Sequence, residues 1–462
     1  LNTGTNLVAD TGNASLTVLG VRGTSGQYGD VTLSTTGTLT IGTSGIGSGT
    51  EIGDVTLSGG TVALTGNITT SGTGNGANQV GDIDINGAAT IDGAVVLTSD
   101  VTGGKTNDGK DDFESTIAGV NTGDDSTADT LTIETGGGTV TLGGTIGAAD
   151  GAHLDGLTIN TTATDADYDA ALSIPAIGTE GTRAGVRGIT SIGNANSGDV
   201  TLSAGGYQFQ DGQTTITSGG SIVTAANANI TSNDNIKLDP GSGSLKFTGD
   251  FDIVSTLNKT VEIAGNSLAV DGGGAGTVDT LTITSGQGSG ATNGTITIGG
   301  TIGSAELKTV TLTAATAINL GGNITTGAIA GGNVTVSGPA VLTADVTVDA
   351  DAANTSITFG TINDDGADGT ASNLNLTTNG GAIQTGIIGG TQAVGTIDIN
   401  SSAGAGNVTL AGIGTSDSGS GNPAAGSTGA VNLGNATTAN LNLGGYFFTG
   451  GTTTIKAEDD DG

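Results

Sequence analysis

The stretch GDVTLS at Gly29–Ser34 decides the fold, because it returns at Gly53–Ser58 and at Gly198–Ser203. Close variants are GDIDIN from Gly81, GNVTVS from Gly332 and GNVTLA from Gly406. In each of them Val, Ile or Leu alternates with Thr, Asp or Ser, which is the pattern of a strand that buries one face. The first copies start at positions 29, 53 and 81. Steps of this size fit one coil of a parallel β-solenoid and are too long for a β-hairpin.

Composition favours the same architecture. Of 462 residues, 89 are glycine and 12% are charged, against about 7% and about 25% in an ordinary globular chain. There is no Gly-X-Y period, which excludes collagen. The alternating apolar strings along the whole chain also argue against disorder.

We therefore predict an all-β protein, a parallel β-helix that forms a single elongated rod. With about 22 to 26 residues per coil the chain makes about 18–20 coils, and at about 4.8 Å per coil the rod is roughly 90 Å long. Glycines at the corners supply the positive φ angles of tight turns. The best helical candidate is the short segment Asp165–Ile174.

A longer repeat is superimposed on the coils. GNITT at Gly66–Thr70 returns at Gly322–Thr326, and AVVLTSDVT at Ala94–Thr102 returns as PAVLTADVT at Pro339–Thr347. GGYQF at Gly205–Phe209 returns as GGYFF at Gly444–Phe448. These echoes keep the same order, so we predict two tandem module copies, residues 1–220 and residues 221–462.

Charge and cysteine content exclude several functions. The formal net charge of −34 repels phosphate backbones and argues against nucleic-acid binding. The absence of cysteine excludes disulfides and thiol chemistry. No apolar run approaches the roughly 20 residues that span a membrane. The start at Leu1, without a signal-peptide pattern, suggests a piece of a longer product.

Catalysis is not expected from these residues. The only histidine, His153, is interpreted as a turn or surface residue, and the only arginines are Arg22, Arg183 and Arg187. A polysaccharide-active β-helix enzyme is a lesser alternative. So is ice binding: TITIGGTIG and TLTITSG predict rows of Thr, but Asp, Asn and Ser interrupt these rows elsewhere in the sequence.

Calcium is the candidate cofactor, although nothing in the sequence requires one. Four glycine-containing acidic segments offer hard oxygen ligands: NDGKDDFE from Asn107, GDDSTAD from Gly123, NDDGADG from Asn363 and EDDDG from Glu458. The candidate ligands are Asp124, Asp125, Asp364, Asp365, Asp368, Asp459, Asp460 and Asp461. Solvated acidic loops are the alternative interpretation.

With GDVTLS, GNITT and GTVTLGGTIG in view, the chain resembles the β-strand-repeat surface proteins of bacteria. These include filamentous-haemagglutinin-like and autotransporter-type adhesins, which are parallel β-helices. The resemblance extends over the whole chain as a Gly-, Thr- and Asn-rich texture. It implies secretion, an extracellular or cell-surface location, and a structural or adhesive role.

Three hypotheses follow. The chain is a subunit of an extracellular filament, sheath or matrix, with itself as the partner in a head-to-tail homopolymer, because neither end shows an amphipathic cap. Alternatively, it is the stalk or passenger of an adhesin that binds glycans or a cell surface. In the third hypothesis it is two modules cut from a long repeat protein.

The aromatic clusters connect the fold with these hypotheses. Tyr207 and Phe209 in the first copy, and Tyr446, Phe447 and Phe448 in the second, stand out in a chain with four tyrosines and seven phenylalanines. They either fill a locally wide coil at the module boundary or form an assembly interface between subunits.

Overall fold

The structure is a computed structural model of residues 1–462. It describes all of them except residues 4, 25–28, 49–51, 71–80, 100–110, 114–115, 121–127, 136–137, 150, 162–170, 180–183, 204, 266–267, 273–278, 287–292, 304–306, 328–331, 368, 402–405, 416–424 and 458–462. The described residues form strands, turns and bends, and they contain no helix. Accordingly, no helix in the described part of the chain could cross a membrane.

The strands pair in parallel and in register, coil upon coil. This confirms the prediction of an all-β parallel β-solenoid. The helical candidate Asp165–Ile174 is wrong in its described C-terminal part, because Leu172–Ile174 forms a strand that pairs with Val200–Leu202.

The chain divides into two compact units. Unit 1 comprises Leu1–Ala225, Ile230–Asp234 and Leu238–Ser242, and unit 2 comprises Ala226–Asn229, Asn235–Lys237 and Gly243–Gly462. Strands β22 (Ala228–Ser232) and β23 (Ile236–Asp239) contribute residues to both. That residues 1–220 and 221–462 are copies of one module stays a prediction.

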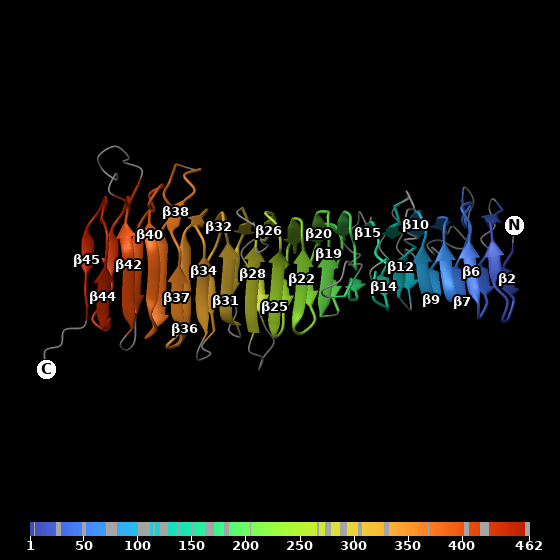
Figure 1. Ribbon diagram of the computed structural model, residues 1–462, viewed down its shortest axis with the longest axis horizontal. Helices are drawn as coiled ribbons and strands as arrows, with labels where there is room; N and C mark the ends of the chain where they lie inside the picture. Colours follow the sequence, from blue (N-terminus) through green and yellow to red (C-terminus); the bar gives the residue numbers. More distant parts are fainter. Residues whose placement is uncertain are drawn as a thin grey trace. The chain divides into compact units, whose positions relative to one another are not determined.

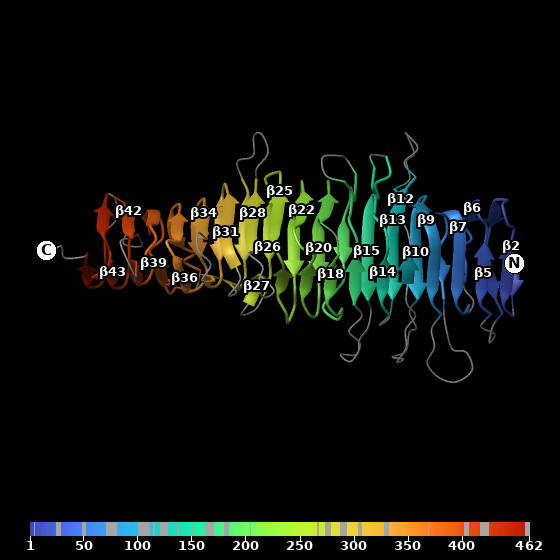
Figure 2. The same cartoon turned by 90° about the horizontal axis from the view of Figure 1, so that it is seen from below.

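In unit 1 the parallel pairs arrange the strands in three stacks, and Figure 2 labels several of their members. The first stack contains β2 (Leu7–Asp10), β5 (Val31–Ser34), β7 (Val55–Leu64), β9 (Ile83–Ile91), β11 (Asp111–Phe113), β14 (Val140–Leu142), β16 (Leu172–Ile174), β18 (Val200–Leu202) and β21 (Ile222–Thr224). The second contains β3 (Leu16–Val18), β6 (Thr38–Ile41), the ends of β7 and β9, β12 (Ile117–Gly119) and β19 (Gly206–Phe209). The third contains β8 (Ile68–Thr69), β10 (Ala94–Ser99), β13 (Thr130–Thr135), β15 (Gly156–Thr161), β17 (Thr190–Ile192) and β20 (Thr214–Thr217). Apart from these stacks, β1 (Asn2–Thr3) pairs with β4 (Arg22–Gly23).

Unit 2 repeats the arrangement (Figure 1). Its first stack contains β24 (Leu245–Phe247), β27 (Leu268–Gly272), β30 (Thr301–Gly303), β33 (Ile324–Thr326), β36 (Val346–Ala353), β39 (Leu374–Asn379), β41 (Ile397–Ser401), β43 (Val431–Leu433) and β45 (Thr453–Ile455). The second contains β25 (Asp250–Ser255), β28 (Asp279–Ser285), β31 (Leu307–Ala314), β34 (Asn333–Ser337), β37 (Ser356–Phe359), β40 (Ile383–Ile388), β42 (Asn407–Ile413) and β44 (Asn440–Leu443). The third contains β26 (Thr260–Ile263), β29 (Thr295–Ile298), β32 (Ala317–Leu320), β35 (Ala340–Leu342) and β38 (Ile362–Asp364).

Coil length varies more than the sequence repeats suggested. In unit 1, Asp199 and Ser221 are hydrogen-bonded across neighbouring coils and are 22 residues apart in the chain. In unit 2, Val394 and Thr428 are hydrogen-bonded across neighbouring coils and are 34 residues apart. The coil length predicted from the sequence therefore describes only the shorter coils. The long coil from Val394 to Thr428 includes residues 402–405 and 416–424, which lie outside the described residues.

The core consists of columns of aliphatic side chains, one residue per coil. Val31, Val55 and Ile83 occupy equivalent positions in three successive coils, and all three are fully buried. The Thr residues beside them, Thr32 and Thr56, point outward and are half-buried. Burial of each aliphatic side chain contributes about 1.5–3 kcal/mol, so the alternating pattern of GDVTLS fixes which face points inward.

Polar side chains at the corners satisfy backbone groups that the strand ladders leave open. The Asn323 Oδ1 accepts the N–H of Thr347 in the next coil at 2.8 Å. The buried Thr378 hydroxyl donates to the carbonyl of Gly381 at 2.9 Å and closes its own turn. In the same way as Asn323, an Asn Oδ1 accepts a backbone N–H of the next coil between Asn67 and Val96, Asn333 and Ser356, and Asn373 and Thr396. An unpaired buried carbonyl costs about 1–3 kcal/mol, so the Thr378 contact stabilises its turn. The Asn contacts are solvent-exposed and contribute less.

Glycine is required where a corner of one coil touches the backbone of the next. Gly45 has a φ of 64°, and a Cβ placed on it would lie 2.1 Å from the carbonyl oxygen of Asn67. Gly12 has a similar φ of 62°, but a Cβ there would meet nothing within 4 Å. A side chain at Gly12 would therefore strain the backbone conformation alone. A side chain at Gly45 would strain the backbone and also clash with the neighbouring coil.

We expect Gly12→Ala to lower the free energy of unfolding by about 1–2 kcal/mol, the cost of the left-handed conformation alone. Gly45→Ala should lower it by about 1–3 kcal/mol more, because its Cβ must displace the neighbouring coil. Urea denaturation followed by circular dichroism measures both changes. Equal losses for the two variants would contradict the contact between Gly45 and Asn67.

Candidate functional sites

The first aromatic cluster is part of the core of unit 1. Tyr207 is fully buried and Phe209 is 2% exposed. The Tyr207 hydroxyl donates to the carbonyl of Ile174 at 3.0 Å, and Tyr207 and Phe209 form bridges to Ile177 and Val186. These contacts place Tyr207 and Phe209 in the core of unit 1, and that the coil around them is locally wide stays a prediction.

The second aromatic cluster has a different environment. Tyr446 is 53% exposed, and its ring stacks on that of Phe448 with centroids 6.0 Å apart and planes at 22°. Phe447 and Phe448 are half-buried, and Phe447 pairs with Ile413. Nearly identical sequences thus form a core element in one unit and an exposed apolar surface in the other. A role of either cluster in assembly stays a prediction.

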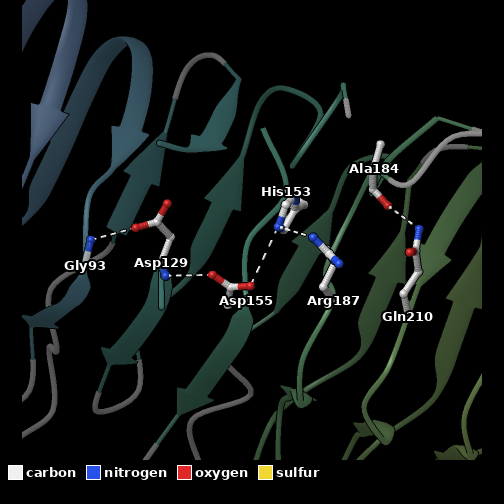
Figure 3. A network of polar contacts seen from close by, with 7 residues as sticks. All are labelled: Gly93, Asp129, His153, Asp155, Ala184, Arg187 and Gln210. Atoms are coloured by element: carbon white, nitrogen blue, oxygen red, sulfur yellow. Dashed lines mark hydrogen bonds and ion pairs between the residues drawn. The ribbon is translucent and has the colours of Figure 1, made fainter. Parts of the chain in front are cut away.

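His153 takes part in a polar network that joins neighbouring coils of unit 1 (Figure 3). Its side chain lies 5% exposed, just before Leu154, which pairs with Val186. The His153 Nε2 is 3.0 Å from Nη1 of Arg187 and 3.7 Å from Oδ1 of Asp155. The interpretation of His153 as a turn or surface residue is wrong in that the side chain is buried.

The chemistry of arginine determines the state of this histidine. A guanidinium can only donate, so Nε2 of His153 accepts from Arg187 and the ring is neutral whenever this hydrogen bond forms. The hydrogen bond between His153 and Arg187 joins two neighbouring coils, and we call this contact the structural lock. It occupies the Nε2 atom that a catalytic base would use. The sequence analysis did not predict the contact between His153 and Arg187, although their separation of 34 residues corresponds to one long coil.

The network continues along one corner of three coils. The Asp155 Oδ2 accepts the N–H of Asp129 at 3.0 Å, and the Asp129 Oδ1 accepts the N–H of Gly93 at 2.8 Å. Asp129, which the sequence places in an acidic segment, is fully buried. Beside the network, Gln210 donates through Nε2 to the carbonyl of Ala184 at 3.2 Å (Figure 3). The carboxylates of Asp129 and Asp155 therefore serve as hydrogen-bond acceptors for backbone N–H groups of the preceding coils.

Of the candidate calcium ligands, Asp364 and Asp365 are described. Asp364 is 5% exposed, and its carboxylate accepts the N–H groups of Gly366 at 2.9 Å and Ser372 at 2.8 Å. Asp365 is exposed and accepts the N–H of Ala367 at 3.0 Å. These bonds shape the turn after β38.

The other candidate ligands, Asp124, Asp125, Asp368, Asp459, Asp460 and Asp461, lie outside the described residues. Within the described part of the chain, no three His, Cys, Asp or Glu side chains group in a way that could hold a metal ion. Calcium binding stays a prediction.

A ladder of carboxyl groups runs along another corner of unit 1. The Asn6 Oδ1 accepts the N–H of Asp30, and the Asp30 Oδ1 accepts the N–H of Asp54, both at 3.1 Å. The Asp54 Oδ1 in turn accepts the N–H of Asp82 at 3.0 Å. The first rung is an amide, and its Nδ2 donates to Oδ2 of Asp30 at 3.1 Å. Each later rung brings two negative charges together.

The surroundings of Asp54 raise the pKa of its carboxyl. Partial desolvation raises the pKa of the Asp54 carboxyl above its ordinary value, while the hydrogen bond from the Asp82 backbone lowers it. The nearby carboxylates of Asp30, Asp82 and Asp84 raise the pKa further. A raised pKa in the folded state gives stability that is fully present below the ordinary pKa and lost as the pH rises through the folded value. At neutral pH the ionised Asp54 therefore destabilises unit 1, by a small amount because the residue is solvent-exposed.

Comparisons with protein-family models, with curated proteins and with solved structures found no match to this chain.

Arg187→Met should lower the free energy of unfolding by about 1–3 kcal/mol, because it leaves the buried Nε2 of His153 without this donor. The matched control is Arg22→Met, since Arg22 is exposed and takes part in none of the ion pairs formed among the described residues. The control should change stability by less than about 0.5 kcal/mol. Urea denaturation distinguishes the two, and equal effects would contradict the lock.

Asp54→Asn should raise the melting temperature of the full chain at pH 7, because the amide keeps the Oδ1 acceptor and removes one charge from the ladder. The gain should disappear as the pH falls below the ordinary carboxyl range, where Asp54 is neutral in any case, and it should shrink in high salt. Asp92→Asn, at an exposed aspartate outside the ladder, is the control and should have little effect. A lower melting temperature for Asp54→Asn at pH 7 would refute the sign of this effect.

Proposed function

We propose that this chain is an extracellular structural protein, a subunit or segment of a surface filament, sheath or matrix. Its copies would join end to end by stacking one β-solenoid coil on another. The observation that carries this proposal is the contrast between the buried Tyr207 cluster and the exposed Tyr446 cluster.

The coil that contains Tyr446 presents an apolar face. Besides Tyr446, Ile455 is 52% exposed, and Leu441 and Leu443 are only half-buried. By register these two leucines continue the columns of Val408 and Leu410, which are buried. The uncovered side chains are therefore of core type, and another coil would bury them.

The backbone supports the same kind of partner. Among the described residues, β44 pairs with β42 and β45 pairs with β43, and no further strand stacks on either. Their outer N–H and C=O groups match the edge of a parallel strand. A second copy offers such strands at its first coils, where Leu1 is 69% exposed and Leu7, which continues the column of the buried Val31, is only half-buried.

Electrostatics sets the conditions for assembly. Two chains of net charge −34 repel each other, whereas the exposed end-coil side chains of Leu1, Tyr446 and Ile455 are uncharged. Association should therefore become stronger as added salt screens the repulsion.

We also propose a structural role over a catalytic one, since His153 is engaged by Arg187 inside unit 1. The extracellular location and the kinship with bacterial surface proteins rest on the sequence resemblance and remain part of this proposal. Under it, binding of host or surface glycans as an adhesin stalk is the alternative.

The triple variant Tyr446→Ser, Phe447→Ser and Phe448→Ser should abolish end-to-end assembly while the circular dichroism spectrum stays that of a β-protein. Replacement removes the apolar surface that a second copy would cover. Multi-angle light scattering over a concentration series, with electron microscopy of the same samples, measures the assembly.

A double variant, Ile189→Ser and Leu257→Ser, serves as the control, because these residues are 70% and 48% exposed but lie away from the last coil. It should assemble like the parent. Parent protein that remains monomeric at every concentration and salt level, or a triple variant that assembles normally, would overturn the proposal.

A further inference from the structure

The outer surface of unit 2 carries a two-dimensional array of hydroxyl groups. It lies on β28, β31, β34 and β37, which pair side by side in this order (Figure 1). We define the hydroxyl array as the outward residues Thr280, Thr282, Thr309, Thr311, Thr313, Thr335, Ser337, Ser356 and Thr358. From the sequence alone, interruptions by Asp, Asn and Ser argued against regular Thr rows. On these four coils one column is unbroken, whereas the exposed Asn333 interrupts the neighbouring column beside Ser356.

The array has a fixed lattice. One column runs through Thr282, Thr311, Thr335 and Thr358 without a break, one residue per coil. Adjacent strands are about 4.8 Å apart, and alternate residues along one strand are about 6.7 Å apart. A neighbouring column places Thr280 against Thr309. Hydroxyl groups therefore recur at a constant step along the unbroken column, and Thr280, Thr309 and Ser356 lie beside it in a second column that Asn333 interrupts.

These side chains are ordered and their hydroxyls are available. The column residues are half-buried, and a β-branched side chain has few χ1 rotamers, so each Thr is held in place by its neighbours. Within the described part of the chain, no hydroxyl of the array is engaged in a hydrogen bond. The buried corner hydroxyls differ, as that of Thr378 shows, because they are engaged by turn carbonyls.

The array is also free of charge in a chain of net charge −34. The charged neighbours lie at its margin: Asp250 and Asp252 on the adjacent β25, and Lys308 at the start of β31. A neutral surface does not select ions or charged polymers. None of the nine residues is aromatic, so the array has no platform on which a sugar ring could stack.

We propose that the hydroxyl array binds ice. A plane of ice is a neutral, repeating lattice of hydrogen-bond donors and acceptors, and the array offers matching groups at constant steps together with the Thr methyl groups between them. The inference is independent of end-to-end assembly, because the array lies on the side of the coils and leaves the last coil free.

The experiment measures thermal hysteresis, the gap between the melting and freezing temperatures of a seeded ice crystal, together with crystal shape. The parent chain should show a gap and faceted crystals. The double variant Thr311→Tyr and Thr335→Tyr should lose both, because two rings at the centre of the array prevent contact with a flat lattice. Thr297→Tyr, at a half-buried outward Thr of β29 outside the array, should leave both unchanged.

A milder variant guards against misfolding. Thr311→Ser with Thr335→Ser keeps the hydroxyls and removes two methyl groups, and it should weaken the hysteresis without changing the urea denaturation curve. Absence of hysteresis and of crystal shaping in the parent would overturn the proposal, as would an equal loss in Thr297→Tyr. Sedimentation of the parent with crystalline cellulose, lost in the tyrosine variant and unaccompanied by hysteresis, would also overturn it by assigning the array to a solid polysaccharide.

Discussion

The in-register parallel pairing of each coil with its neighbours is the constraint on which the rest of the structure depends. A coil cannot satisfy its own backbone, so its N–H and C=O groups must meet those of the coils on either side. Strands achieve this along their length, but corners do not. At a corner, backbone N–H and C=O groups need other partners or a close approach of the next coil. The structure shows three arrangements that provide this: the Asn323 side chain, the Thr378 hydroxyl and the close approach at Gly45. The high content of Gly, Asn, Asp and Thr follows from the number of corners.

The same constraint explains why acidic residues have such different roles. At a corner a carboxylate is a good acceptor for a backbone N–H, and Asp129 and Asp364 act in this way while buried. Several coils use the same solution at one corner in the ladder from Asp30 to Asp82, where partial desolvation raises the pKa of Asp54 and the neighbouring carboxylates raise it further. A segment that is acidic in the sequence can therefore be part of the backbone framework, in addition to being a candidate for calcium.

Much of the fold could be predicted, because repetition in the sequence translates directly into register. The GDVTLS copies at Val31 and Val55 are direct partners in the structure, and Ile83 of GDIDIN continues their column. The sites were less predictable. Tyr207 and Tyr446 stand in nearly the same local sequence, and their burial differs because it depends on whether a further coil covers them. The contact of His153 with Arg187 joins two irregular segments, where no alternating pattern marks the register.

The stacking of coils also determines how each unit would respond to force. Tension along the stacking direction is shared at each interface by the three strand ladders and the corner contacts together, so no single bond carries the load. Tension on one free strand acts on its ladder bond by bond and removes a single coil, which leaves the next coil with the same exposed edge. A unit built in this way is strong when pulled as a whole and fails by peeling from an end.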